Sequence, residues 1–149
     1  DFYKGIARIT SGFLKKEAEL LEKGYAAEAV EKYVLAAPEY REDIARIYDH
    51  TEEFVELYDY AIPWICELKE RGYKVYVLSN WSEPAYEANK ETHLRFLKEV
   101  DGAIMSFREG MIKPDQEIYQ LLCDRYHINP KDAVFLDDNK ANIDAALII

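Results

Sequence analysis

The pattern of hydrophobic and polar positions divides the chain into two parts. Residues 1–57 carry apolar side chains at three- and four-residue steps with charges between them, which is typical of amphipathic helices. Gly24 is expected to end the first of three helices there, and Pro38 to separate the other two. From Tyr58 onward, helical patterns alternate with short apolar runs. The sequence therefore predicts a small α-helical module over residues 1–57 and an α/β unit over residues 58–149.

Three short apolar runs in the second part predict the strands of one parallel sheet. They cover residues 73–78, 102–106 and 133–136. The last run, AVFL, is continuously apolar, as expected for a strand that is buried on both faces. Because helices alternate with these runs, we predict an α/β fold with a Rossmann-like parallel sheet wrapped by helices.

The segments between the runs have their own signals. A helix is predicted from Ala61 to Arg71, closed by Gly72, and another over residues 116–126. Residues 83–100 are expected to be helical or irregular, and residues 107–112 to form a loop.

The composition argues against some classes of binding partner. The chain has 149 residues, about one domain, and 49% of them are hydrophobic, which favours a folded core. It carries 29 acidic against 19 basic residues, a net charge of −10, so nucleic acid and anionic membrane are not expected as partners. No apolar run approaches the roughly 18 residues of a membrane span. Cys66 and Cys123 lack metal-binding spacing and are expected to be reduced thiols of a cytoplasmic protein.

Polar residues follow each of the three apolar runs. They are Ser79, Asn80 and Trp81 after the first run, Lys113 after the second, and Asp137 and Asp138 after the third. The carboxyl ends of parallel strands meet at one edge of a sheet, and open α/β sheets bind ligands at that edge. We therefore expect these side chains to lie close together.

These residue types suit a phosphoryl group and its metal. The Ser79 hydroxyl and the amide of Asn80 can donate hydrogen bonds to phosphate oxygens, and Lys113 can offset the charge on the transferring group. Adjacent carboxylates raise each other's pKa unless a cation or donors compensate, and Mg²⁺ would do so at Asp138 and Asp137. Taken singly, each motif is also explained as an ordinary turn, helix start or acidic cap.

Three further residues complete the expected site. Asn139 is a good N-cap for a helix that begins after the carboxylates. Asn142 lies one helical turn beyond Asp138 and could brace it. Trp81 could shape a substrate pocket, with a place in the core as the alternative.

The segments VLSNWS at 77–82, IKPD with IY at 112–119, and FLDDN with NI at 135–143 resemble the second, third and fourth motifs of the haloacid dehalogenase-like (HAD) hydrolase superfamily. The motifs occur in order, and the resemblance extends over residues 58–146. It implies a HAD-like core with a helical cap, as in subfamily IA, whose members include sugar-phosphate phosphatases. The implied activity is a Mg²⁺-dependent phosphatase on small phosphorylated metabolites, through an aspartyl-phosphate intermediate, with Ser79 and Lys113 as catalytic residues and Trp81 among those that bind substrate.

Two departures from the family pattern leave alternatives open. The first motif of the family is a strand ending in a nucleophilic Asp, and only Asp1-Phe2 could be its trace. The helix after the fourth motif runs directly into Leu147. The core is thus expected to be incomplete at both ends, and these residues alone are expected not to catalyse. The alternatives are a 2-haloacid dehalogenase, whose chemistry needs no metal, and a non-catalytic HAD-like binding or regulatory protein.

Overall fold

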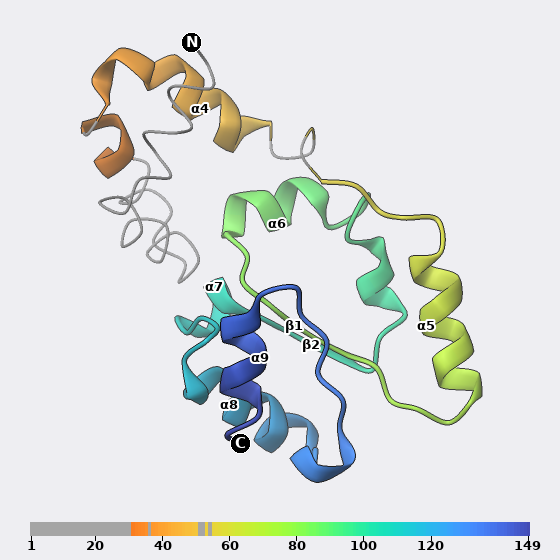
Figure 1. The fold of residues 1–149 in the computed structure, drawn as a ribbon. Coiled ribbons are helices and arrows are strands. Elements are labelled where there is room, and N and C mark those ends of the chain that lie inside the picture. The colour runs from red at the N-terminus through yellow and green to blue at the C-terminus, as the bar shows by residue number, and fades with distance from the viewer. Residues whose placement is uncertain (1–30, 36, 51–52, 54) are drawn as a thin grey trace.

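The fold is described from a computed structural model that covers residues 31–35, 37–50, 53 and 55–149 (Figure 1). Residues 31–35 are helical. The elements that follow are the 3₁₀ turn η2 (Pro38–Tyr40), α4 (Arg41–Asp49), α5 (Ala61–Glu70), β1 (Tyr76–Ser79), α6 (Glu83–Asn89), η4 (Arg95–Lys98), β2 (Gly102–Met105), α7 (Ser106–Glu109), α8 (Gln116–Tyr126), η5 (Pro130–Asp132) and α9 (Lys140–Ala146).

The two strands pair in parallel. Tyr76 lies opposite Gly102 and Ser79 lies opposite Met105, so both strands end at the same edge of the sheet. The outer side of β2 is fastened by Tyr126 of α8, whose hydroxyl accepts from the Ala103 N–H at 3.0 Å and donates to the Ala103 carbonyl at 3.1 Å. This pairing confirms the expected parallel α/β fold.

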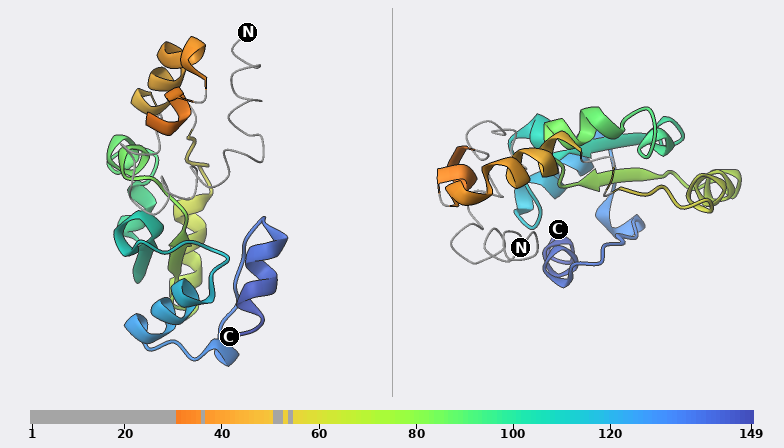
Figure 2. Two further views of the ribbon diagram at one scale, coloured as in Figure 1. Left: turned by 90° about the vertical axis from the view of Figure 1, so that its left-hand side faces the viewer. Right: turned by 90° about the horizontal axis from the view of Figure 1, so that it is seen from above.

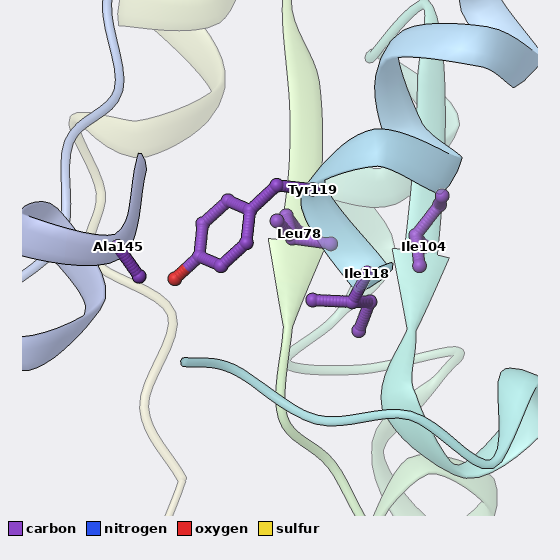
Figure 3. Close-up of a cluster of buried hydrophobic side chains, with 5 residues drawn as sticks. All are labelled: Leu78, Ile104, Ile118, Tyr119 and Ala145. Carbon is purple, nitrogen blue, oxygen red and sulfur yellow. The ribbon is translucent and has the colours of Figure 1, made fainter. Parts of the chain in front are cut away.

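The buried core joins the sheet to the last two helices. Its members are Leu78 of β1, Ile104 of β2, Ile118 and Tyr119 of α8, and Ala145 of α9 (Figure 3). Ile104 and Ile118 are completely buried, and the Tyr119 ring extends from α8 toward Ala145. Burial of this apolar surface, at about 25 cal/mol per Å², stabilises the packing of α8 and α9 against the sheet.

The strand predicted at residues 133–136 does not form. Residues 133–137 belong to no helix or strand, and Val134 and Leu136 are 86% and 69% exposed. Only Phe135 packs on the core, where its ring meets Tyr119 edge-on at 5.5 Å. A strand needs a neighbour that takes up its N–H and C=O groups, and no third strand in the described part of the chain supplies one. The prediction of a strand buried on both faces is therefore wrong for residues 133–136.

The helices agree more closely with the predicted ranges. The predicted bounds of α8 are those observed, and α5 ends one residue earlier than expected, before Gly72 at φ 90°. The expected loop at 107–112 instead begins with the short helix α7, which Gly110 ends at φ 65°. Both cysteines are free thiols, and both are only partly buried.

The predicted cap over residues 1–57 is described only in part. The helix expected between Ile6 and Leu21, its end at Gly24, and Asp1 lie outside the described residues. A helix at 31–35 and α4 on either side of Pro38 agree with the prediction. Helix α4 contacts α6 and lies beyond it, at the end of the molecule remote from η5 (Figure 2). No helix among the described residues is long and apolar enough to cross a membrane.

Candidate active site

Asn80 fastens the loop before α8 to the end of β1. Its side-chain amide donates to the Lys113 carbonyl at 3.0 Å, and its side-chain oxygen accepts from the Lys113 N–H at 2.9 Å. An Asn side chain can form this reciprocal pair because it has one acceptor and one donor group in a plane. Lys113 is thereby held at the carboxyl end of β1, as the sequence predicted. The Asn80 side chain is committed to this role, so its backbone N–H is the group left as a predicted phosphate donor.

Lys113 forms an ion pair with Asp137. The Lys113 Nζ lies 2.5 Å from the Asp137 Oδ2, and the two side chains are only 9% and 7% exposed. The Nζ also lies 5.7 Å from the centre of the Phe135 ring. A buried ion pair of this kind requires further hydrogen bonds to offset the loss of water.

The second oxygen of the Asp137 carboxylate accepts hydrogen bonds from the N-cap residue and from a side chain of α9. Its Oδ1 accepts from the Asn139 N–H at 2.9 Å and from the Asn142 side-chain amide at 2.9 Å. Burial raises the pKa of Asp137, but the hydrogen bonds from Lys113, Asn139 and Asn142 outweigh it and hold the pKa below its usual value. Asp137 is therefore ionised at neutral pH. Asn142, which was predicted to brace Asp138, donates to Asp137 instead.

Asp138 has a different environment from its neighbour. Its side chain is exposed, and it forms no hydrogen bond or ion pair with any described residue. Mg²⁺ keeps several waters and binds through one or two carboxylates, so Asp138 fits as a ligand. Asp137 fits less well, because three donors already occupy its oxygens. No group of three or more His, Cys, Asp or Glu side chains within the described ranges could enclose a metal.

Ser79 and Trp81 are the chain neighbours of Asn80, which bonds the Lys113 backbone. Ser79 is the last residue of β1 and is partly buried. The Trp81 backbone is fixed by Ser106, whose hydroxyl accepts from the Trp81 N–H at 2.9 Å and donates to the Trp81 carbonyl at 3.1 Å. The site loop after β1 is therefore attached to the first residue of α7.

Sequence reasoning missed two supporting residues, Ser106 and Tyr119. Ser106 is completely buried, and its position as the polar last residue of the apolar run 102–106 was the available signal. The Tyr119 hydroxyl donates to the Asn142 carbonyl at 3.0 Å. Burial, with a smaller contribution from the charge of Asp137, raises the pKa of Tyr119 to about 12, so this hydroxyl stays protonated. Tyr119 thus supports the turn of α9 that holds Asp137.

The chemistry follows from these contacts. A continuous chain of hydrogen bonds runs from Asn80 through Lys113 and Asp137 to Asn142, and joins the ends of three segments that are far apart in the sequence. A cation fixed by a buried carboxylate cannot move away from a bound anion without losing its partner, which is the preorganisation that transition-state stabilisation requires. Beside it stands a carboxylate, Asp138, that is open to solvent.

The sequence is similar to those of known hydrolases. A sesquiterpene phosphatase from Aspergillus oryzae is 34% identical over 80 residues, which are 54% of this chain and 40% of that protein. An (S)-2-haloacid dehalogenase from Burkholderia cepacia is 30% identical over 80 residues, covering 54% and 34% of the two chains. The chain therefore spans at most two fifths of the length of these relatives.

Solved structures agree with the fold. A HAD family enzyme from Bacteroides thetaiotaomicron superposes with a TM-score of 0.79 at 23% identity, over 99% of this chain and 78% of that one. The same enzyme in complex with magnesium and inorganic phosphate superposes with a TM-score of 0.71 at 20% identity, over 99% and 80%. A family model described as haloacid dehalogenase-like hydrolase matches residues 2–147. The chain belongs to the haloacid dehalogenase-like hydrolases.

Proposed function

We propose that this chain forms the site of a Mg²⁺-dependent phosphatase that acts on small phosphorylated metabolites. The observation that carries the proposal is the buried pair of Lys113 and Asp137 beside the exposed Asp138. This arrangement offers a fixed cation for a phosphate oxygen and a solvent-facing carboxylate for a hydrated metal. The relatives add support, because one is a phosphatase and the solved enzyme was obtained with magnesium and phosphate.

Each residue has a defined role in the proposal. The Ser79 hydroxyl and the Asn80 N–H donate to phosphate oxygens, and Lys113 stabilises the charge that develops on the transferring group. Asp138 is the metal ligand among the described residues, and Asp137 holds Lys113 in place. When bound, Mg²⁺ would polarise a phosphoryl oxygen. The aspartate that attacks phosphorus in an aspartyl-phosphate mechanism is not assigned to a residue of this chain.

The helical residues before position 58 are proposed to serve as the cap. The contact between α4 and α6 supports this role, because α6 begins directly after the site loop Ser79–Ser82. A helical cap beside the strand ends would exclude water from the transferring group. A cytoplasmic location stays a prediction from the composition and the free thiols.

The test measures both phosphatase activity and the binding of Mg²⁺ and inorganic phosphate. Hydrolysis of p-nitrophenyl phosphate by the full-length protein is measured with and without Mg²⁺ for the wild type, Lys113→Ala and Asp138→Asn, with Asp144→Asn as the matched control. Asp144 lies on the same helix as the site but pairs with Lys140 at the surface. Calorimetric titration with Mg²⁺ and with inorganic phosphate runs in parallel. We expect Mg²⁺-dependent turnover that falls on the order of 100-fold in both site variants and is unchanged in the control.

The outcomes separate the candidate functions. Mg²⁺-dependent phosphate binding without turnover would assign the chain to the binding-protein alternative. Chloride release from 2-chloropropionate without any metal requirement would favour the dehalogenase, a second candidate supported by the Burkholderia cepacia relative. If neither Mg²⁺ nor phosphate binds, the phosphatase proposal is wrong.

A further inference from the structure

Arg108 lies over two aromatic rings at the carboxyl ends of β1 and β2. Its Cζ is 4.6 Å from the centre of the Tyr86 ring and 5.4 Å from that of the Phe107 ring, and the two rings are 5.4 Å apart. Tyr86 belongs to α6, which begins after the loop that follows β1. Phe107 and Arg108 belong to α7, which directly follows β2. The cluster therefore joins the two elements that leave the edge of the sheet where the candidate site lies.

The position of the cluster relative to the site is fixed by hydrogen bonds. Ser106, the residue before Phe107, is bonded to both backbone groups of Trp81. On the other side, the chain passes Gly110 and reaches Lys113, whose backbone is bonded to the Asn80 side chain. Arg108 thus lies in a short segment that is tied to the site loop at both of its ends.

The carboxylates nearest to Arg108 in sequence and on α6 are already paired. Glu109 accepts two hydrogen bonds from Arg125, at 2.6 and 2.8 Å, and Glu87 pairs with Lys90 at 2.5 Å. In the part of the chain that the structure describes, Arg108 has no ion-pair partner and its side chain is exposed. Lys113 is offset by Asp137. Arg108 is consequently a cation that no described carboxylate contacts directly, although its charge, after that of Arg125, helps to lower the pKa of Glu109.

We propose that Arg108 is a specificity-determining residue that binds a carboxylate on the substrate while the phosphate group binds beside Lys113. The inference rests on the proposed function and narrows its substrate class to small phosphorylated acids. The aromatic rings cover a face of the guanidinium and leave its N–H groups, which lie in the plane of the group, able to form the paired hydrogen bonds that a carboxylate accepts. Because the rings restrict the side chain before binding, less rotamer entropy is lost when the ligand arrives.

The experiment compares two probes that differ at one end. Phosphoglycolate carries a phosphate and a carboxylate, and 2-hydroxyethyl phosphate replaces the carboxylate with a hydroxymethyl group. Binding of each probe is measured by calorimetry in Mg²⁺ buffer for the wild type, Arg108→Gln, Arg108→Lys and Tyr86→Leu. Lys131→Gln is the control, because it removes one positive charge from an exposed residue of η5.

The expected result is a change in the ratio of the two affinities. Arg108→Gln should weaken phosphoglycolate about tenfold and 2-hydroxyethyl phosphate less than twofold, since a charge-assisted hydrogen bond is lost for one probe alone. Arg108→Lys should retain part of the preference, because it keeps the charge without the planar donors. Tyr86→Leu should reduce the preference by releasing the guanidinium, and Lys131→Gln should leave both affinities unchanged.

Other results would overturn the inference. An unchanged affinity ratio in Arg108→Gln, together with a lower melting temperature, would make Arg108 a purely structural brace of α6 and α7. Equal weakening of both probes would place Arg108 at the phosphate or make its effect one of general charge. The proposed function fails in a distinct way, in which neither the wild type nor any of the variants binds either probe.

Discussion

Lys113 and Asp137 are 24 residues apart in the sequence and lie in contact, with 2.5 Å between the Nζ and the Oδ2. Each side chain is less than one tenth exposed. The two adjacent carboxylates therefore differ in environment. Asp137 neutralises the Lys113 ammonium, and Asp138 is exposed to solvent. A pair of residues that are chemically alike in the sequence is therefore not alike in the protein.

The first prediction concerns the cost of breaking this pair. Asp137→Asn leaves the Lys113 ammonium buried without a counter-charge, so we expect the free energy of unfolding to fall by about 3 kcal/mol. Asp138→Asn, at an exposed position, should change it by less than about 0.5 kcal/mol. Urea unfolding followed by circular dichroism measures both. Equal effects of the two substitutions would contradict the assigned difference in burial.

A second prediction follows from the lowered pKa of Asp137. A carboxyl group whose pKa is lower in the folded than in the unfolded state contributes stability above its ordinary value, 3.8 for Asp137, and that contribution is lost as the pH falls through the folded-state pKa. The wild type should therefore lose stability more steeply than Asp137→Asn between about pH 4 and pH 2. The measurement is the urea midpoint of both proteins across this range. Parallel curves would show that Asp137 is not stabilised in its ionised form.

Gly102 gives a third prediction, because Tyr126 lies against it. A Cβ added at Gly102 would overlap the Tyr126 ring, which also holds Ala103 through two hydrogen bonds and packs on Tyr76 at a centroid distance of 5.0 Å. Gly102→Ala should displace the ring and destabilise the protein by about 2 kcal/mol.

A double-mutant cycle checks this explanation. In a Tyr126→Leu background the space beside residue 102 is opened, so Gly102→Ala should cost much less there than in the wild type. The same cost in both backgrounds would mean that the ring is not the obstacle.

Ser106 provides a fourth prediction. Ser106→Ala removes the hydroxyl that bonds both backbone groups of Trp81 and leaves those groups without this partner inside the protein, so we expect a loss of about 2 kcal/mol. Hydrogen exchange at the Trp81 amide should become faster in the variant. Ser82→Ala is the comparison, because Ser82 caps α6 through a longer contact of 3.4 Å to the Ala85 N–H. A Trp81 amide that exchanges as in the wild type would contradict the role given to Ser106.

The sequence by itself determined the order of the elements and the residue types of the site. Helix α8 and the N-cap at Asn139 could be predicted because capping and helical periodicity are local properties of the chain. The convergence of Asn80 and Lys113 could also be predicted, since it follows from parallel strands that end at one edge. Asp137 was expected at the same place, but it reaches Lys113 from a segment that pairs with neither strand.

The tertiary structure alone decided which groups are paired and which face solvent. The apolar run at residues 133–136 has the pattern of a buried strand, yet Val134 is 86% exposed, because pairing depends on a neighbouring strand that a local pattern cannot supply. In the same way, only the fold places Lys113 against Asp137, directs Asn142 to Asp137 and sets Arg108 over the ring of Tyr86. Burial and charge pairing are properties of contacts between distant segments, and for that reason the sequence pattern left them open.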